Sequence, residues 1–181
     1  MVASWKRSDA EGADLAKMVG VPNPAPKEPD AAVPPRFVRH LKGAAHRRRG
    51  HETPWVAVVR VDGVDAIRDL WGDPATEEFL RSVSSVLRAS LRESDKLSPV
   101  GRSEYGIILD APSPERVTAG LRRMVHNVGE LAGRDPRWSD GALRAGVTRL
   151  DVADPGAVLD RARRALDSAG DARVAMAADS D

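Results

Sequence analysis

The sequence predicts an α+β fold, a central antiparallel-mixed sheet flanked by helices, with the order β-α-β-β-α-β between residues 55 and 150. Short apolar or alternating segments indicate strands, and longer segments with apolar residues three and four positions apart indicate helices. The two kinds of segment follow one another in the order of the ferredoxin-like fold. In that fold the helices are expected on one face of the sheet.

The first half of this core starts with a strand. Trp55 to Val59 is a near-continuous apolar run, as expected for a strand covered on both faces. Asp73 and Pro74 then provide an N-cap and a first-turn proline for a helix. Its apolar face consists of Phe79, Leu80, Val83, Val86, Leu87 and Leu91. Residues 97–100 and 105–109 are typical of the two strands of a hairpin.

The second half repeats the alternation of helix and strand. Ser113 and Pro114 cap a second helix, whose inward-facing residues are Val117, Leu121, Met124, Val128 and Leu131. Leu143, Ala145 and Val147 alternate as in a strand. Asp154-Pro155 begins a third helix, which Gly170 ends, and a short strand follows near Val174.

The ends of the chain predict tails around one domain. Residues 1–13 are expected to form an N-terminal tail, residues 14–175 the domain, and residues 176–181 a disordered C-terminal tail. Residues 10–19 have the pattern of a short helix. Six prolines between residues 22 and 35 predict a loop, and a further helix is expected behind it, with Phe37 and Leu41 on its apolar face.

The composition excludes several classes of protein. The 181 residues carry a net charge of +1 and no cysteine, so neither a disulfide framework nor a thiolate metal site is possible. The longest apolar runs are too short to span a bilayer, and the N-terminus lacks the apolar region of a secretory signal. We therefore expect a cytoplasmic domain that does not bind membranes.

One short segment is more informative than the rest. The residues Gly101-Arg102-Ser103-Glu104-Tyr105 precede an apolar run and stand five residues after Arg92-Glu93-Ser94-Asp95. This layout resembles the GGDEF domain, the bacterial fold that joins two GTP into cyclic di-GMP. Further similar segments, in the family's order, are residues 18–23, 61–64 and 162–166, together with Gly72. The resemblance implies a palm-type nucleotidyl cyclase core, in agreement with the pattern of strands and helices.

The same resemblance implies that the chemistry of the family is lost. The two carboxylates that would hold its metal ions fall on Arg60 and Ser103. Arginine is a fixed cation that repels a metal, and serine carries no charge. The positions that read guanine fall on Arg68 and Glu77, and Arg102 replaces a glycine of the signature. We therefore expect a degenerate family member with no catalytic residue, no metal and no cofactor.

Three acidic or aromatic residues remain near the altered positions. Asp62, Glu104 and Tyr105 match the second carboxylates and the end of the signature. They do not restore the metal site, and we interpret them as ordinary turn residues.

The R-x-x-D segment, in contrast, is intact. The resemblance implies that Arg92 and Asp95, with Arg123 on the second helix, form the family's inhibitory site for cyclic di-GMP. Arginine can donate two parallel hydrogen bonds to guanine, and a carboxylate can accept from its ring nitrogens. The family often binds the ligand as an intercalated pair, which would promote a homodimer. A helix-terminal arginine with a turn aspartate explains the same residues without a ligand.

Three functions remain open. The chain is either a cyclic di-GMP receptor that signals to an unidentified protein partner, or an interaction scaffold that binds no nucleotide. A third reading is a basic module using residues 36–51, which hold six arginine or lysine residues. Aromatic residues are scarce there, so we expect a solvated helix end and no specific nucleic-acid binding. The histidines of this segment are not spaced as metal ligands on one helical face.

Overall fold

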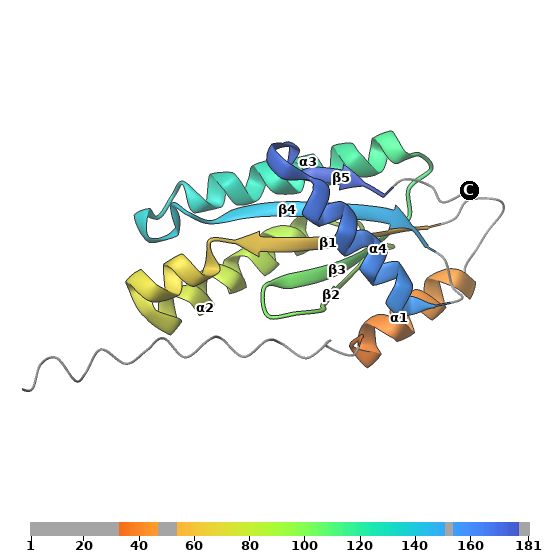
Figure 1. Ribbon diagram of the computed structural model, residues 1–181, viewed down its shortest axis with the longest axis horizontal. Helices are drawn as coiled ribbons and strands as arrows, with labels where there is room; N and C mark the ends of the chain where they lie inside the picture. Colours follow the sequence, from red (N-terminus) through yellow and green to blue (C-terminus); the bar gives the residue numbers. More distant parts are fainter. Residues whose placement is uncertain (1–32, 47–53, 151–153, 178–181) are drawn as a thin grey trace, which may run out of the picture. The chain divides into compact units, whose positions relative to one another are not determined.

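The computed structural model describes residues 33–46, 54–150 and 154–177. Figure 1 shows a sheet with helices packed against it. The helices are α1 (Pro35–His46), α2 (Val64–Ser90), α3 (Pro114–Ala132) and α4 (Pro155–Ser168), with short 3-10 turns η2 (Pro136–Trp138) and η3 (Gly170–Ala172). The strands are β1 (Trp55–Asp62), β2 (Lys96–Pro99), β3 (Glu104–Leu109), β4 (Ala142–Arg149) and β5 (Val174–Met176). The predicted order β-α-β-β-α-β is confirmed.

The five strands form one mixed sheet with the order β2-β3-β1-β4-β5. All neighbouring pairs are antiparallel except β4 and β5, which are parallel. Strand β1 lies in the centre, where Arg60 pairs with Glu104 of β3 on one side and with Arg144 of β4 on the other. Three charged residues therefore meet across three strands.

Helices cover both faces of the sheet, so the expectation of helices on one face is only partly right. The two helices of the β-α-β-β-α-β core, α2 and α3, do share one face and pack on residues such as Ala57 and Val59. The opposite face, with Val56 and Val58, is buried by α1 and α4, which lie outside that core order. Coverage on both faces explains why β1 is apolar at successive positions.

Helix α2 begins earlier than the sequence predicts. The expected start at Asp73 and Pro74 is the start of its second segment, because the helix is kinked at Gly72, whose φ is 79°. This conformation is open to glycine at little cost. The first segment, residues 64–71, was missed. Just before the kink, Leu70 and Trp71 are exposed by 70% and 53%.

The other helices predicted within the described residues are confirmed. Ser113 Oγ accepts a hydrogen bond from the Arg116 amide (3.4 Å), and Asp154 Oδ1 accepts one from the Gly156 amide (2.8 Å), so both predicted N-caps are present. In α1 the predicted Phe37 and Leu41 are buried.

Three expectations about the ends of the chain concern, in whole or in part, residues that the structure does not describe. The helix predicted at residues 10–19, and the proline-rich loop up to residue 32, lie outside the described residues. Met176 is the last residue of β5, and residues 178–181 are again outside the described part. No helix in the described ranges is long and apolar enough to cross a membrane.

Candidate functional site

The altered signature lies in the β2–β3 hairpin. Gly101, Arg102 and Ser103 form the connection, while Glu104 and Tyr105 open strand β3. The interpretation of Asp62, Glu104 and Tyr105 as turn residues is therefore wrong, because Asp62 also belongs to a strand, β1. They are strand residues because β3 pairs with β1 up to Glu104, and β1 pairs with β4 up to Asp62.

An ion-pair network occupies the expected metal position. Arg60 Nε donates to Glu104 Oε1 (2.9 Å), and Arg60 Nη1 donates to Asp167 Oδ1 (2.9 Å). The other oxygen of Glu104 accepts from Arg163 Nε (3.1 Å). Both oxygens of this carboxylate thus face a guanidinium.

The charges of the network are mutually satisfied. Burial lowers the pKa of Arg60, but the hydrogen bonds and charge attraction to Glu104 and Asp167 outweigh burial, so the pKa lies above its ordinary value. Beside it, Arg144 donates two hydrogen bonds to Asp62, at 2.6 and 2.8 Å, and this pairing raises the pKa of Arg144. In the described residues no group of three or more histidine, aspartate or glutamate side chains could hold a metal ion.

The sequence indicated only part of this network. The sequence indicates Arg60, as a replaced metal-ligand position, and Glu104, as a remaining acidic residue. It does not indicate Arg144, Arg163 or Asp167. The register places Arg144 beside Arg60, and α4 lies over this face. Neither the pairing partner of β1 nor the position of α4 follows from local sequence.

Removal of the central carboxylate should destabilise the fold. Glu104 is only 13% exposed, and Glu104→Gln leaves Arg60 and Arg163 without their shared anion. We expect a loss of about 1–3 kcal/mol of unfolding free energy, measured by urea denaturation.

Asp160→Asn is the matched control for this substitution. Asp160 is 61% exposed and lies 3.9 Å from Arg163, so its neutralisation should change the unfolding free energy by less than about 0.5 kcal/mol. Equal effects of the two substitutions would contradict a structural role for Glu104.

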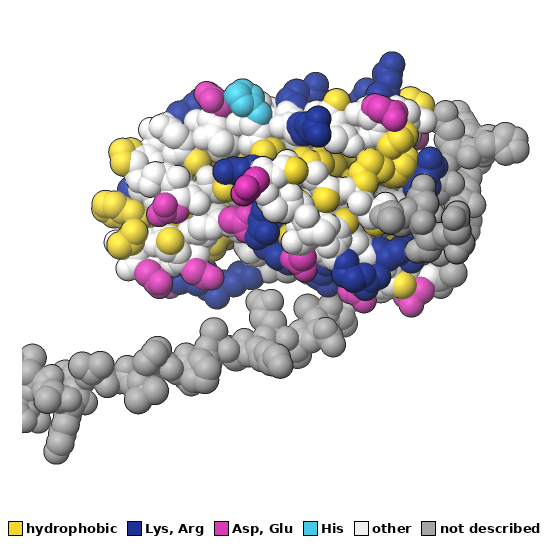
Figure 2. All heavy atoms as spheres, turned by 45° about the horizontal axis from the view of Figure 1, so that its top comes forward, with side chains coloured by type: hydrophobic (Ala, Val, Ile, Leu, Met, Phe, Trp, Pro, Cys, Tyr) yellow, Lys and Arg dark blue, Asp and Glu magenta, His cyan; other side chains and the backbone are white. Residues whose placement is uncertain are grey.

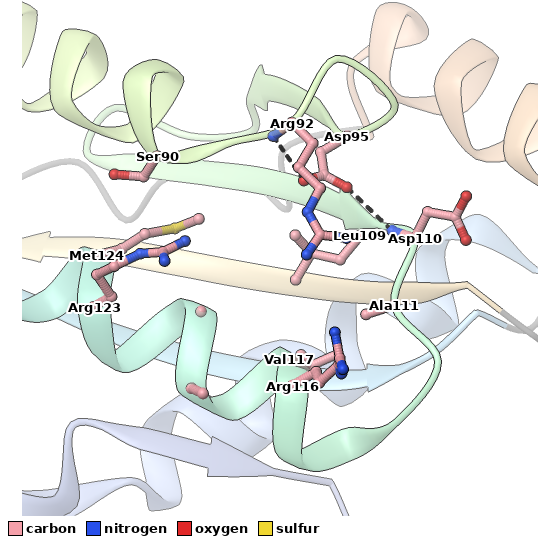
Figure 3. Close-up of a pocket in the computed structure, with 12 residues that line it drawn as sticks. Ser90, Arg92, Asp95, Leu109, Asp110, Ala111, Arg116, Val117, Arg123 and Met124 are labelled. Carbon is pink, nitrogen blue, oxygen red and sulfur yellow. Dashed lines mark hydrogen bonds between the residues drawn. The ribbon is translucent and has the colours of Figure 1, made fainter.

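A pocket of about 220 Å³ lies on the α2/α3 side of the sheet. It is formed by the turn between α2 and β2, the end of β3 and one side of α3 (Figure 3). Arg92, Asp95 and Arg123, the three residues expected to form the inhibitory site, all line it. The structure thus brings together residues that are up to 31 positions apart in the sequence.

Asp95 holds the rim of this pocket in shape. Its Oδ2 accepts a hydrogen bond from the Arg92 amide (3.0 Å), and its Oδ1 accepts one from the Asp110 amide (3.2 Å). The turn aspartate of the ligand-free interpretation is therefore present. A carboxylate has about four acceptor positions in total, so two remain for a ligand.

Three arginines of the pocket have unused donors. Arg92 is exposed on the turn, and Arg116 and Arg123 are exposed on α3. Figure 3 shows their guanidinium groups around the same opening. Within the described part of the chain, none of these three guanidiniums makes a hydrogen bond or an ion pair. The sequence does not indicate Arg116, because only the fold places its side of α3 opposite the R-x-x-D turn.

Hydrogen bonds within the protein fix the backbone around the pocket. Trp55 Nε1 donates to the Ala111 carbonyl (3.1 Å), which positions the segment after β3. Lys96 Nζ donates to the Glu93 carbonyl inside the R-x-x-D turn (2.7 Å). A site held in this way needs little reorganisation to bind.

The pocket and the altered signature are far apart. The signature opens β3 at Glu104, whereas the pocket contains Leu109 at the end of the same strand. At roughly 3.3 Å per residue this separates them by about 17 Å. They also lie on different faces, since Glu104 contacts α4 and the pocket contacts α3.

The other sequence candidates are engaged or exposed. Arg68, at a guanine-reading position, pairs with Asp65 (2.8 Å) and Asp73 (3.4 Å). Glu77 is exposed. Of the basic segment 36–51, Arg36 and Arg39 are exposed on α1, and residues 47–51 lie outside the described ranges. Figure 2 shows that basic and acidic side chains are interspersed on the face in view.

A family model described as the diguanylate cyclase GGDEF domain matches residues 36–174, which is more than half of the chain. A curated relative, the probable diguanylate cyclase DgcT of Escherichia coli strain K12, is 28% identical over 121 residues, or 64% of this chain. The chain spans about a quarter (27%) of that relative's length.

Solved structures show the same fold. The GGDEF domain of DgcB from Caulobacter crescentus, in complex with c-di-GMP, has a TM-score of 0.66 at 22% identity, covering 78% of this chain and 88% of that one. The diguanylate cyclase SiaD from Pseudomonas aeruginosa, in complex with its activator SiaC, has a TM-score of 0.69 at 21% identity. That match covers 83% of this chain and 61% of the SiaD chain.

Proposed function

The chain belongs to the GGDEF domain family, and we propose that it is a catalytically inactive member that binds cyclic di-GMP through Arg92, Asp95 and Arg123. The observation that carries this proposal is the contrast between two sites. The pocket is preformed and has unused guanidinium donors. At the signature, in contrast, the remaining carboxylate Glu104 is held between Arg60 and Arg163.

The chemistry of the pocket suits a cyclic dinucleotide of guanine. Arg92 can donate in parallel to guanine O6 and N7 or to a phosphodiester, and Asp95 retains acceptor positions for guanine N1 and N2 hydrogens. Arg123, from the opposite wall, supplies a second cation for the phosphates. The GGDEF domain of DgcB was solved in complex with c-di-GMP, and so was the S helix-GGDEF-EAL part of Vibrio cholerae LapD.

The chemistry of the signature end does not suit phosphoryl transfer. That reaction needs divalent metal to neutralise the charge that develops on the phosphate. Ser103 provides no carboxylate, and Arg60 places a cation at the other ligand position. Glu104 would have to leave two guanidiniums before it could face a metal ion.

We further propose that the bound state is passed to a protein partner. SiaD, a structural neighbour, was solved with the protein SiaC as its activator. Binding of an intercalated ligand pair would also bring two copies together, because such a pair presents two faces.

The alternative function, a scaffold that binds no nucleotide, is favoured by one observation. Leu70 and Trp71 are both more than half exposed, side by side at the kink of α2. Tryptophan is enriched among the residues that dominate protein interfaces. An exposed surface of this kind is compatible with both the receptor and the scaffold. A measurement of cyclic di-GMP binding therefore decides between the two functions.

Isothermal titration calorimetry of the protein with cyclic di-GMP, and separately with GTP, tests the proposal. We expect saturable heat with cyclic di-GMP and a much weaker response to GTP, which has one guanine and no second half for the opposite wall. Absence of heat at excess cyclic di-GMP would contradict the receptor function and favour the scaffold that binds no nucleotide.

Residues 36–51 should not form a specific nucleic-acid site. Arg36, Arg39 and Lys42 are exposed on α1, and their binding to duplex DNA should be weak and electrostatic. Because each phosphate contact releases a counterion, binding should fall steeply between 50 and 200 mM salt, by about tenfold or more. Fluorescence anisotropy with duplexes of different sequence measures this, and sub-micromolar, sequence-selective binding at physiological salt would contradict it.

A further inference from the structure

The pocket extends along α3 beyond Arg123. Arg116 lines it at the other end, seven positions earlier on the same helix. Seven residues correspond to two helical turns, or about 10.5 Å along the axis. Two unused guanidiniums therefore stand at the two ends of one helical wall, with Arg92 on the turn opposite (Figure 3).

The pocket wall between the two arginines has only small side chains. Ala119 and Gly120 are the pocket residues between them, together with buried Val117. A Cβ atom placed on Gly120 would meet nothing within 4 Å. Ala119 and Gly120, called the Gly120 strip below, thus leave open space on the helix between the two cations.

The charges of the pocket point to a ligand with more than one anionic group. Three guanidiniums line it, against the carboxylates of Asp95 and Asp110. Asp95 already accepts two backbone amides, and Figure 3 shows the Asp110 carboxylate directed away from the opening. Mutual repulsion of the three arginines is relieved when phosphates bind between them.

We propose that Arg116 and the Gly120 strip bind the second half of the cyclic dinucleotide. Arg116 contacts a phosphodiester or guanine edge that Arg92 and Arg123 do not reach, and a base or the sugar-phosphate ring lies over Gly120. This inference rests on the proposed function and extends the ligand-contacting set from three residues to five. It predicts that the affinity for cyclic di-GMP depends on the size of the side chain at position 120 as well as on the charge of Arg116.

Calorimetric titration of single variants with cyclic di-GMP tests this proposal. Arg116→Ala removes a charge-assisted contact, and we expect affinity to fall by about tenfold. Gly120→Gln places a neutral side chain on the strip, and we expect a similar loss. Gly120→Ala adds only one methyl group and should bind within about threefold of the parent, with a higher melting temperature because alanine favours helix.

Two matched controls lie on the same helix. Arg122→Ala removes an exposed arginine outside the pocket, and Gly129→Gln adds the same side chain where a Cβ also meets nothing within 4 Å. Both should keep parental affinity, and thermal unfolding of every variant confirms that it is folded.

The outcomes separate this inference from the proposed function. If Arg92→Ala weakens binding but Arg116→Ala and Gly120→Gln bind as the parent does, the extended wall is wrong and the receptor function stands. If the parent itself binds no cyclic di-GMP, both are wrong. Equal losses of affinity in Arg116→Ala and Arg122→Ala would show that Arg116 contributes only nonspecific positive charge, and would overturn its assignment as a ligand contact.

Discussion

Incubation of the purified protein with GTP and Mg²⁺ or Mn²⁺ is expected to yield no cyclic di-GMP. The positions that the family resemblance assigns to the metal ligands are Arg60 and Ser103, and neither side chain is a carboxylate. The nearby Glu104 carboxylate is committed to Arg60 and Arg163. Product is measured by chromatography against a no-enzyme control, with an active diguanylate cyclase as positive control. Steady product formation above the no-enzyme control would refute the loss of catalysis.

Restoration of one carboxylate should not rescue the reaction. Ser103→Asp leaves the Arg60 guanidinium beside Glu104, so a metal ion still meets a fixed cation. We expect Ser103→Asp to remain inactive in the same assay. Activity in this single variant would show that Arg60 does not block the metal position.

Arg92→Ala is expected to weaken cyclic di-GMP binding by about ten- to a hundredfold, because it removes a bidentate, charge-assisted contact of about 1–3 kcal/mol. Its side chain is exposed and has no partner among the described residues, so the substitution should leave the unfolding free energy nearly unchanged. Calorimetry and urea denaturation measure the two quantities. Parental affinity in Arg92→Ala would contradict the site.

Asp95→Ala should differ from Arg92→Ala in a specific way. Asp95 accepts the amides of Arg92 and Asp110, so its removal leaves two backbone donors without their partner. We expect a similar loss of affinity together with a loss of about 1–2 kcal/mol of stability. If Asp95→Ala lowered stability but not affinity, the turn aspartate would be purely structural.

Local sequence predicted much of the fold. The helical stripe of α3, the alternation in β4 and the caps at Ser113 and Asp154 are each set by neighbouring residues, and the structure confirms them. The packing of α1 and α4 over the second face was not predicted, since it depends on contacts between distant segments. The helical segment before Gly72 was missed because the Asp73-Pro74 cap was interpreted as the start of the whole helix, and the sequence does not reveal the φ of Gly72 that joins the two segments.

The residues of the candidate site likewise divide into those that the local sequence indicates and those that only the fold brings together. Arg92 and Asp95 lie on one turn and were identified from the R-x-x-D spacing. Arg123 was suggested by the family resemblance, and the fold places it across the same pocket. No local sequence pattern indicates Arg116 or Arg163, because arginines on exposed helical faces are common. Only the tertiary structure places Arg116 at the pocket and Arg163 beside Glu104.

Amide chemical shifts of the ¹⁵N-labelled protein during titration with cyclic di-GMP test the central claim most directly, that the ligand pocket is kept while the signature site is closed. We predict that the largest changes occur in residues 92–95, 109–111 and 116–124, which surround the pocket. Residues 101–104 should stay nearly unchanged, since they lie about 17 Å or more from the pocket at the other end of β3. Asp62, at the same end of the neighbouring strand β1, should also stay nearly unchanged. The largest changes at the signature, or none anywhere at excess ligand, would contradict the account.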